Sequence, residues 1–231
     1  VFVKAGLRED NKTGTLDLEL TLSPSEAWQE ALEKQAAQNQ MEWGNLGAVI
    51  RAELLDADGN LVYALPEQLG PCRNSGKIAV SFLGDEGIPD IRPWSGEDPY
   101  LYTLMLTVSD RSTGEVYEVI PQKIGFRRFQ MKDKVMELNG KRIIFKGINR
   151  HEFNHRRGRC VTREDMLWDI RFLKQHNINA VRTCHYPNQS LWYELCDMYG
   201  IYLIDEANLE SHGSWQKMGA CEPSWNVPGS L

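Results

Sequence analysis

The chain has 231 residues, of which 42% are hydrophobic and 25% charged, with a formal net charge of −6 at pH 7. This length allows one large domain or two ordinary ones, and the apolar fraction allows sizeable cores. The acidic balance argues against a nucleic-acid partner and a cationic membrane anchor, and no apolar stretch reaches the roughly 18 residues of a membrane span. Five scattered cysteines do not predict a disulfide framework, so we expect a reducing, cytoplasmic setting.

Short strands separated by Asp/Gly turns are predicted throughout residues 1–122. Leucine alternates with other side chains over residues 16–22, which is the period of a half-buried strand. Further strands are expected at residues 48–55, 61–65, 77–82, 100–108 and 116–120. This pattern is typical of an immunoglobulin-like β-sandwich.

One helix is expected to interrupt the sandwich, and a linking strand is expected after the end of the sandwich. Residues 23–39 are rich in good helix formers, and Ser23 or Ser25 can cap them, so we predict a helical insertion there. Residues 123–133 are expected to form the linker to a second domain.

The second domain is expected to span residues 134–231 and to alternate strands with helices. It begins with a hairpin whose turn is Asn139-Gly140, a strong turn signal. Strands are then expected at residues 143–148, 178–183 and 201–204. A buried parallel strand is apolar along its length, and residues 201–204 fit that description.

Two helices are predicted between these strands. Thr162 and Asp165 have the spacing of a near capping box, and an apolar stripe of Met166, Ile170 and Leu173 follows. Asn188 is the expected N-cap of the second helix, and Gly200 is the expected residue just past its end.

Polar side chains collect where each predicted strand of the second domain ends. Asn149, Arg150, His151 and Glu152 follow the first strand. Arg182, Thr183, Cys184 and His185 close the second, and Asp205, Glu206, Asn208, Glu210 and His212 follow the third. Active sites of α/β barrels lie at the carboxyl ends of their strands, so this edge is the candidate site.

Glu210 and His212 are two residues apart and therefore lie on one face of an extended segment. A carboxylate and an imidazole placed in this way can share a divalent cation, and an ordinary ion pair in a loop is the alternative. The histidines that follow the first two strands, His151 and His185, are by themselves more typical of structural hydrogen-bonding groups.

The segment Asn179-Ala-Val-Arg182-Thr-Cys-His185-Tyr-Pro187, followed by Asp197-Met-Tyr-Gly200 and by Asp205-Glu-Ala-Asn208-Leu-Glu210-Ser-His212-Gly213, resembles glycoside hydrolase family 2. The last of these stretches is similar to the β-galactosidase branch in particular. The resemblance implies an immunoglobulin-like sandwich followed by the first three βα units of a (β/α)8 TIM barrel. It implies part of a retaining glycosidase that cleaves terminal β-D-galactosides.

The same resemblance assigns candidate residues. His151, Arg182 and His185 match positions at the sugar-binding site, Asn208 is a further candidate there, and Glu206 supports it. Glu210 and His212 match residues that bind Mg²⁺ in β-galactosidases. The intact enzyme is expected to be a homo-oligomer that binds a β-galactoside.

A glycosidase needs two carboxyl groups that flank the bond. The resemblance places both after later strands than those present, so no catalytic residue is assigned in this chain, and the chain alone is expected to be inactive without the rest of its polypeptide. The alternatives are another family 2 activity, β-glucuronidase or β-mannosidase, and a non-catalytic carbohydrate-binding or assembly fragment. The pair Glu210 and His212 favours the galactosidase.

Overall fold

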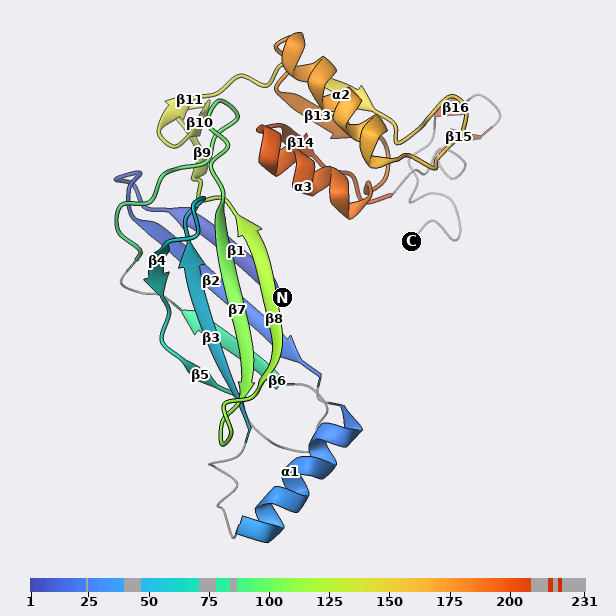
Figure 1. Cartoon of the computed structure of the whole chain (residues 1–231). Coiled ribbons are helices and arrows are strands. Elements are labelled where there is room, and N and C mark those ends of the chain that lie inside the picture. The colour runs from blue at the N-terminus through green and yellow to red at the C-terminus, as the bar shows by residue number, and fades with distance from the viewer. Residues whose placement is uncertain are drawn as a thin grey trace. The chain divides into compact units, whose positions relative to one another are not determined.

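The structure, a computed structural model, describes residues 1–23, 25–39, 47–70, 78–83, 87–208, 216–217 and 220–221. It forms two compact units, Val1–Ile144 and Phe145–Leu231, each with its own core. Figure 1 labels the helices and strands of both units.

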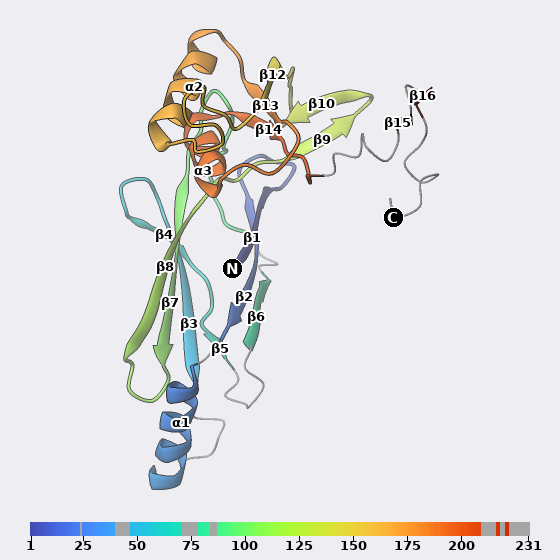
Figure 2. The ribbon, with the colours of Figure 1, turned by 90° about the vertical axis from the view of Figure 1, so that its right-hand side faces the viewer.

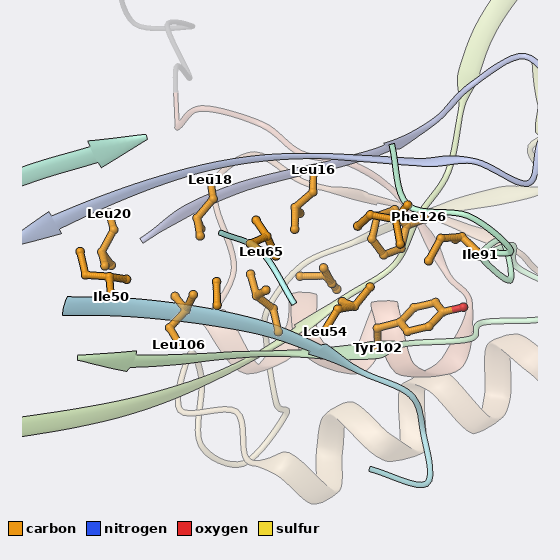
Figure 3. Packing of buried hydrophobic residues seen from close by; sticks show 14 of the residues in the cluster. Leu16, Leu18, Leu20, Ile50, Leu54, Leu65, Ile91, Tyr102, Leu106 and Phe126 are labelled. Carbon is orange, nitrogen blue, oxygen red and sulfur yellow. The ribbon is translucent and has the colours of Figure 1, made fainter. Parts of the chain in front are cut away.

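The core of the first unit lies between two antiparallel sheets that face each other (Figures 1 and 3). One sheet has the order β1-β2-β6, with β1 at Phe2–Leu7, β2 at Gly14–Leu22 and β6 at Ile78–Leu83. The other has the order β4-β3-β7-β8, with β5 also paired to β3. Its strands are β3 (Ala48–Leu55), β4 (Leu61–Ala64), β5 (Gln68–Leu69), β7 (Tyr102–Asp110) and β8 (Val116–Ile124).

Alternation of side chains along the strands builds the core of this unit. Leu16, Leu18 and Leu20 of β2 are buried, as the leucine periodicity predicted. They point across the core toward Ile50 and Leu106 of the opposite sheet (Figure 3). Because a strand presents alternate residues to opposite faces, this single leucine period fixes which face of the sheet is covered.

The predicted helical insertion is present as α1, Glu26–Asn39. The hydroxyl of Ser25 accepts a hydrogen bond from the Trp28 amide at 3.2 Å, so Ser25 caps the helix. The helix lies at one end of the two sheets (Figures 1 and 2).

The Asn-Gly hairpin also forms as predicted, with positive φ at Asn139 and Gly140. Its strands are β10 (Val135–Leu138) and β11 (Lys141–Arg142), and β9 (Phe129–Lys132) pairs with the other side of β10. Asn139 accepts a hydrogen bond from the Arg128 amide and donates one to the carbonyl of Trp94. The hairpin therefore groups with the first unit, which ends at Ile144.

The second unit contains a parallel sheet in the order β12-β13-β14. Its strands are β12 (Gly147–Arg150), β13 (Ala180–Thr183) and β14 (Tyr202–Ile204), and its helices are α2 (Arg163–Gln175) and α3 (Ser190–Tyr199). The two helices lie together beside the sheet (Figure 2), and their buried residues share one core with Val181 and Ile201. A two-stranded pair, β15 (Gln216–Lys217) and β16 (Ala220–Cys221), is also present.

The signals for the ends of these helices are largely confirmed. Thr162 and Asp165 form a complete capping box, and Gly200 adopts the left-handed conformation past α3. Asn188 is not the N-cap of α3, which is Gln189, because its side chain is used elsewhere: its carbonyl oxygen accepts from Arg150. No helix in the described part of the chain is long and apolar enough to span a membrane.

The first strand of this unit begins later than the sequence predicted. Residues 143–148 were expected, but β12 starts at Gly147. The reason is that the Ile143 amide donates to the carbonyl of Met136 and so continues the preceding hairpin. The parallel register then starts where Gly147 lies opposite Ala180.

Candidate functional site

The three parallel strands bring their carboxyl ends to one edge. In the register, Asn149 lies opposite Arg182, and Arg182 lies opposite Ile204. These three positions share one face of the sheet, and the positions between them share the other. The polar residues that follow the strands are therefore divided between two faces.

Arg182, His185 and Glu206 form a hydrogen-bonded network on the Arg182 face. Arg182 Nε donates to Glu206 Oε1 at 2.5 Å, and His185 Nδ1 lies 2.8 Å from Glu206 Oε2. Arg182 Nη1 also donates to Asn149 Oδ1 at 3.3 Å. One carboxylate thus fixes the orientation of both a guanidinium and an imidazole.

The charge of Glu206 determines which ring nitrogen of His185 donates a hydrogen bond to it. Burial raises the pKa of its carboxyl, but the hydrogen bonds from His185 and Arg182 outweigh burial, so the pKa lies below its ordinary value. An ionised carboxylate can only accept, so His185 Nδ1 donates to it. A neutral imidazole in this tautomer carries its lone pair on Nε2.

His151 lies beside this network. Its ring is edge-on to that of His185, with centroids 5.5 Å apart, and its side chain is exposed. The Cys184 thiol, which accepts from Arg182 Nη1 at 3.4 Å, lies close to both rings. The peptide bond between Cys184 and His185 is cis.

Arg150 organises the opposite face, although the sequence patterns predicted no individual role for it. Its side chain is only 6% exposed, and its Nε pairs with Asp169 of α2 at 2.9 Å. Its Nη1 donates to Asn188 at 2.7 Å, and the guanidinium lies 3.8 Å from the centre of the Trp192 ring of α3. Arg150 therefore joins β12 to both helices and to the segment that carries His185.

Glu152 extends this anchoring from the next position on the same face. It is 7% exposed, and its Oε1 accepts from the amide of Gln189, which is the N-cap of α3. Its carbonyl accepts from the hydroxyl of Tyr186. The only sequence signal for these roles is the alternation at the end of the strand, which sends residues 150 and 152 to the face opposite His151.

Asp205 closes a second small network at the end of β14. Its Oδ1 accepts from the hydroxyls of Thr183 and Tyr193, each at 2.8 Å. The Thr183 hydroxyl in turn accepts from the Glu206 amide at 3.1 Å. These contacts hold the segment after β14 against β13, and so fix the backbone that presents Glu206.

The structure brings together three of the four sugar-binding residues predicted from the sequence. His151, Arg182 and His185 are neighbours, whereas Asn208 is exposed, has a φ of 55°, and makes no side-chain hydrogen bond within the described residues. The predicted metal pair, Glu210 and His212, lies outside the described residues. The assembled groups can donate and accept hydrogen bonds at a surface of fixed geometry, which suits recognition of hydroxyl groups.

Both parts of the chain are similar to known proteins of one family. A family model described as glycosyl hydrolases family 2 matches residues 1–127, and one described as the TIM barrel domain of that family matches residues 129–230. A β-galactosidase of Clostridium acetobutylicum is 52% identical over the whole chain, and one of Streptococcus thermophilus is 70% identical over 61% of it. The chain spans only 22% and 14% of the lengths of these relatives.

Solved structures show the same fold. A glycosyl hydrolase family 2 member from Bacteroides cellulosilyticus matches 89% of the chain with a TM-score of 0.72 and 23% identity, over 24% of its own length. A β-glucuronidase from Bacteroides uniformis matches 89% of the chain with a TM-score of 0.71 and 22% identity, over 22% of its length. The two family models together cover nearly all of the sequence, and the chain therefore belongs to glycosyl hydrolase family 2.

Proposed function

We propose that this chain is part of a retaining glycoside hydrolase that cleaves terminal β-D-galactosides. The observation that carries the proposal is the network of Arg182, His185 and Glu206 beside His151 at the carboxyl ends of parallel strands. Imidazoles and a guanidinium held in this way can bind sugar hydroxyls more strongly as charge develops in the transition state.

The sequence relatives favour galactoside over other substrates. Relatives that are 52% and 70% identical to this chain over their aligned residues are named β-galactosidases. The β-glucuronidases among the solved structures are much less similar in sequence, and they support the fold alone. β-Glucuronidase and β-mannosidase activity therefore remain the second candidates.

The fold supports an assignment of each unit. The first unit, with its two facing antiparallel sheets, is assigned as an immunoglobulin-like sandwich. The second is assigned as the first three βα units of an eight-stranded barrel, in which inward side chains belong beside those of strands further round the ring. The domain bounds 1–122, 123–133 and 134–231, a homo-oligomeric intact enzyme and a cytoplasmic location belong to the same proposal.

The proposal includes a Mg²⁺ ion bound by Glu210 and His212 in the intact enzyme. The carboxylate of Glu210 is an oxygen donor of the kind that Mg²⁺ prefers, and His212 would be an additional, softer ligand. Two protein ligands are few for Mg²⁺, which commonly keeps several waters. When bound, the ion would supply positive charge near the site.

No catalytic carboxyl group is assigned within these 231 residues. Glu206 is already committed to Arg182 and His185, which suits a supporting role better than that of an acid or nucleophile. The chain alone is therefore expected to give no turnover. A non-catalytic carbohydrate-binding role is the alternative of a different class.

The test compares one full-length enzyme that contains this chain on chromogenic β-galactoside, β-glucuronide and β-mannoside. We expect hydrolysis of the galactoside only, and a large fall in kcat/KM in His185→Ala. Arg51→Ala is the matched control, because its ion pair with Glu67 is half-exposed and lies in the first unit. Equal rates on the three substrates, or an unchanged His185→Ala enzyme, would contradict the proposal.

A further inference from the structure

Three potential metal ligands, two imidazoles and one thiol, lie close together at the edge of the sheet. Within the described part of the chain, His151, Cys184 and His185 form the one group of three ligating side chains whose donor atoms all lie within 4.8 Å of one another. The two imidazoles come from different strand ends, and the thiol precedes one of them directly in the sequence.

The donor atoms of this group lie close enough together for a small movement to bring them to the spacing of a zinc site. Zn²⁺ binds imidazole nitrogen at about 2.0–2.1 Å and thiolate sulfur at about 2.3 Å, so its tetrahedral ligands lie roughly 3.5 Å apart. The separations here are at most 4.8 Å and so need to shorten by no more than about 1.3 Å. His151 is exposed and can supply that movement, whereas Cys184 is 2% exposed and is held in place.

The chemistry of the donors selects the metal. Two nitrogens and one sulfur suit a borderline-soft cation, while Mg²⁺ requires oxygen ligands. Three protein ligands leave a fourth position for water, as in zinc sites that exchange their fourth ligand.

The neighbouring charges decide whether a cation is tolerated. Arg182 is a cation that lies against the thiol, but it pairs with Glu206, which offsets its repulsion. Glu206 orients His185 through Nδ1, an arrangement common for metal-bound imidazoles.

We propose that His151, Cys184 and His185 form a Zn²⁺ site, separate from the Mg²⁺ pair proposed above. Because two of its ligands are the imidazoles assigned to sugar binding, Zn²⁺ and galactoside exclude each other. The inhibition part of this inference rests on the proposed function, whereas the binding part does not.

The binding test uses Co²⁺, because Zn²⁺ has no visible spectrum. Co²⁺ added to the 231-residue chain should give a thiolate-to-metal charge-transfer band that Zn²⁺ removes by competition. The band should be absent in Cys184→Ser and should be retained in Cys196→Ser. Cys196 is the matched control, since it is a buried thiol of the same unit whose pKa burial raises, so it stays protonated.

A second variant guards against misfolding. The side chain of His151 is exposed, so His151→Ala should fold normally and should bind Zn²⁺ at least ten-fold more weakly. A charge-transfer band that survives in Cys184→Ser, or unchanged Zn²⁺ affinity in a folded His151→Ala chain, would overturn the proposed site.

The inhibition test uses a full-length enzyme that carries this chain. Micromolar Zn²⁺ should raise KM for a β-galactoside in the parent enzyme and should have much less effect in Cys184→Ser. Zn²⁺ binding with unchanged KM would overturn the mutual exclusion. Galactosidase activity in the absence of Zn²⁺ tests the proposed function separately, so the two failures are distinguishable.

Discussion

Arg150 should contribute more to the stability of the second unit than any surface ion pair. Replacement by alanine removes the pair with Asp169, the hydrogen bond to Asn188 and the contact with the Trp192 ring. Breaking a buried ion pair costs about 3–5 kcal/mol, and a desolvated cation–π contact contributes about 2 kcal/mol. Asp169 is 34% exposed, so water can hydrate the carboxylate that is left behind.

These contributions are not additive, and partial hydration of Asp169 reduces the cost of breaking the ion pair. The expected loss of stability is therefore near the lower end of the range of about 3–5 kcal/mol. We expect Arg150→Ala to lower the free energy of unfolding of the second unit by about 3 kcal/mol, a large fraction of the 5–15 kcal/mol typical of a domain. Hydrogen exchange followed peptide by peptide measures the two units separately. Amides of β13 and α3 that exchange through opening of this unit should exchange roughly 100-fold faster.

A matched control lies in the same unit. Arg157 pairs with Asp165, but its side chain is 48% exposed, so Arg157→Ala should change the same exchange rates by less than about five-fold. Peptides of β3 and β7, in the other unit, should be unaffected by either substitution. If Arg150→Ala behaves like Arg157→Ala, the reasoning that this arginine holds the helices to β12 is wrong.

Three further predictions test other parts of the chain. Burial raises the pKa of the Asp110 carboxyl, but hydrogen bonds from neighbouring donors outweigh burial and lower this pKa from 3.8 to about 2. The ionised carboxylate therefore stabilises the fold by about 2 kcal/mol above pH 4, and this stabilisation is lost as the pH falls through 2. Asp110→Asn should show this deficit in urea unfolding at pH 7 and not at pH 2. Glu206→Gln should lower kcat/KM of a full-length enzyme about ten-fold, mainly through KM, because Arg182 and His185 lose their common acceptor; an unchanged KM would contradict this. In the 231-residue chain, the amides of β14, an edge strand within the described residues, should exchange faster than those of the central strand β7, and slow exchange in a monomer would contradict an open sheet.

Local signals in the sequence predicted most of the elements. The alternation of Leu16, Leu18 and Leu20 gave a strand and its buried face, because a period of two has one structural solution when one face is covered. The Asn139-Gly140 turn and the capping box at Thr162 were confirmed because each depends on backbone geometry within a few residues. The resemblance to a known family added the order in which these elements assemble.

The errors arose where a polar group of a residue had two possible partners. Asn188 is a good helix cap by type, but Arg150, 38 residues earlier in the chain, uses its oxygen instead. Ile143 is apolar and β-prone, yet its amide completes the preceding hairpin and does not enter the parallel sheet. Neither competition is visible in a local window, because the competing partner is specified by the tertiary fold.

At this edge of the sheet, the residues that stabilise the unit and the residues of the candidate binding site lie on opposite faces. At the end of β12, Arg150 and Glu152 face the helices, while Asn149 contacts Arg182 and His151 lies beside His185. The alternation of a strand therefore gives successive residues opposite tasks.

This division has a measurable consequence for the same pair of neighbours. A change at Arg150 should alter hydrogen exchange in α3 and affect ligand binding only through the position of His185. A change at His151 should alter ligand or Zn²⁺ affinity and leave exchange unchanged, since its exposed side chain is not packed in the core. Residues 149–152 thus both stabilise the unit and form part of its candidate site. The two effects can be measured independently, because the side chains responsible for them point to opposite faces.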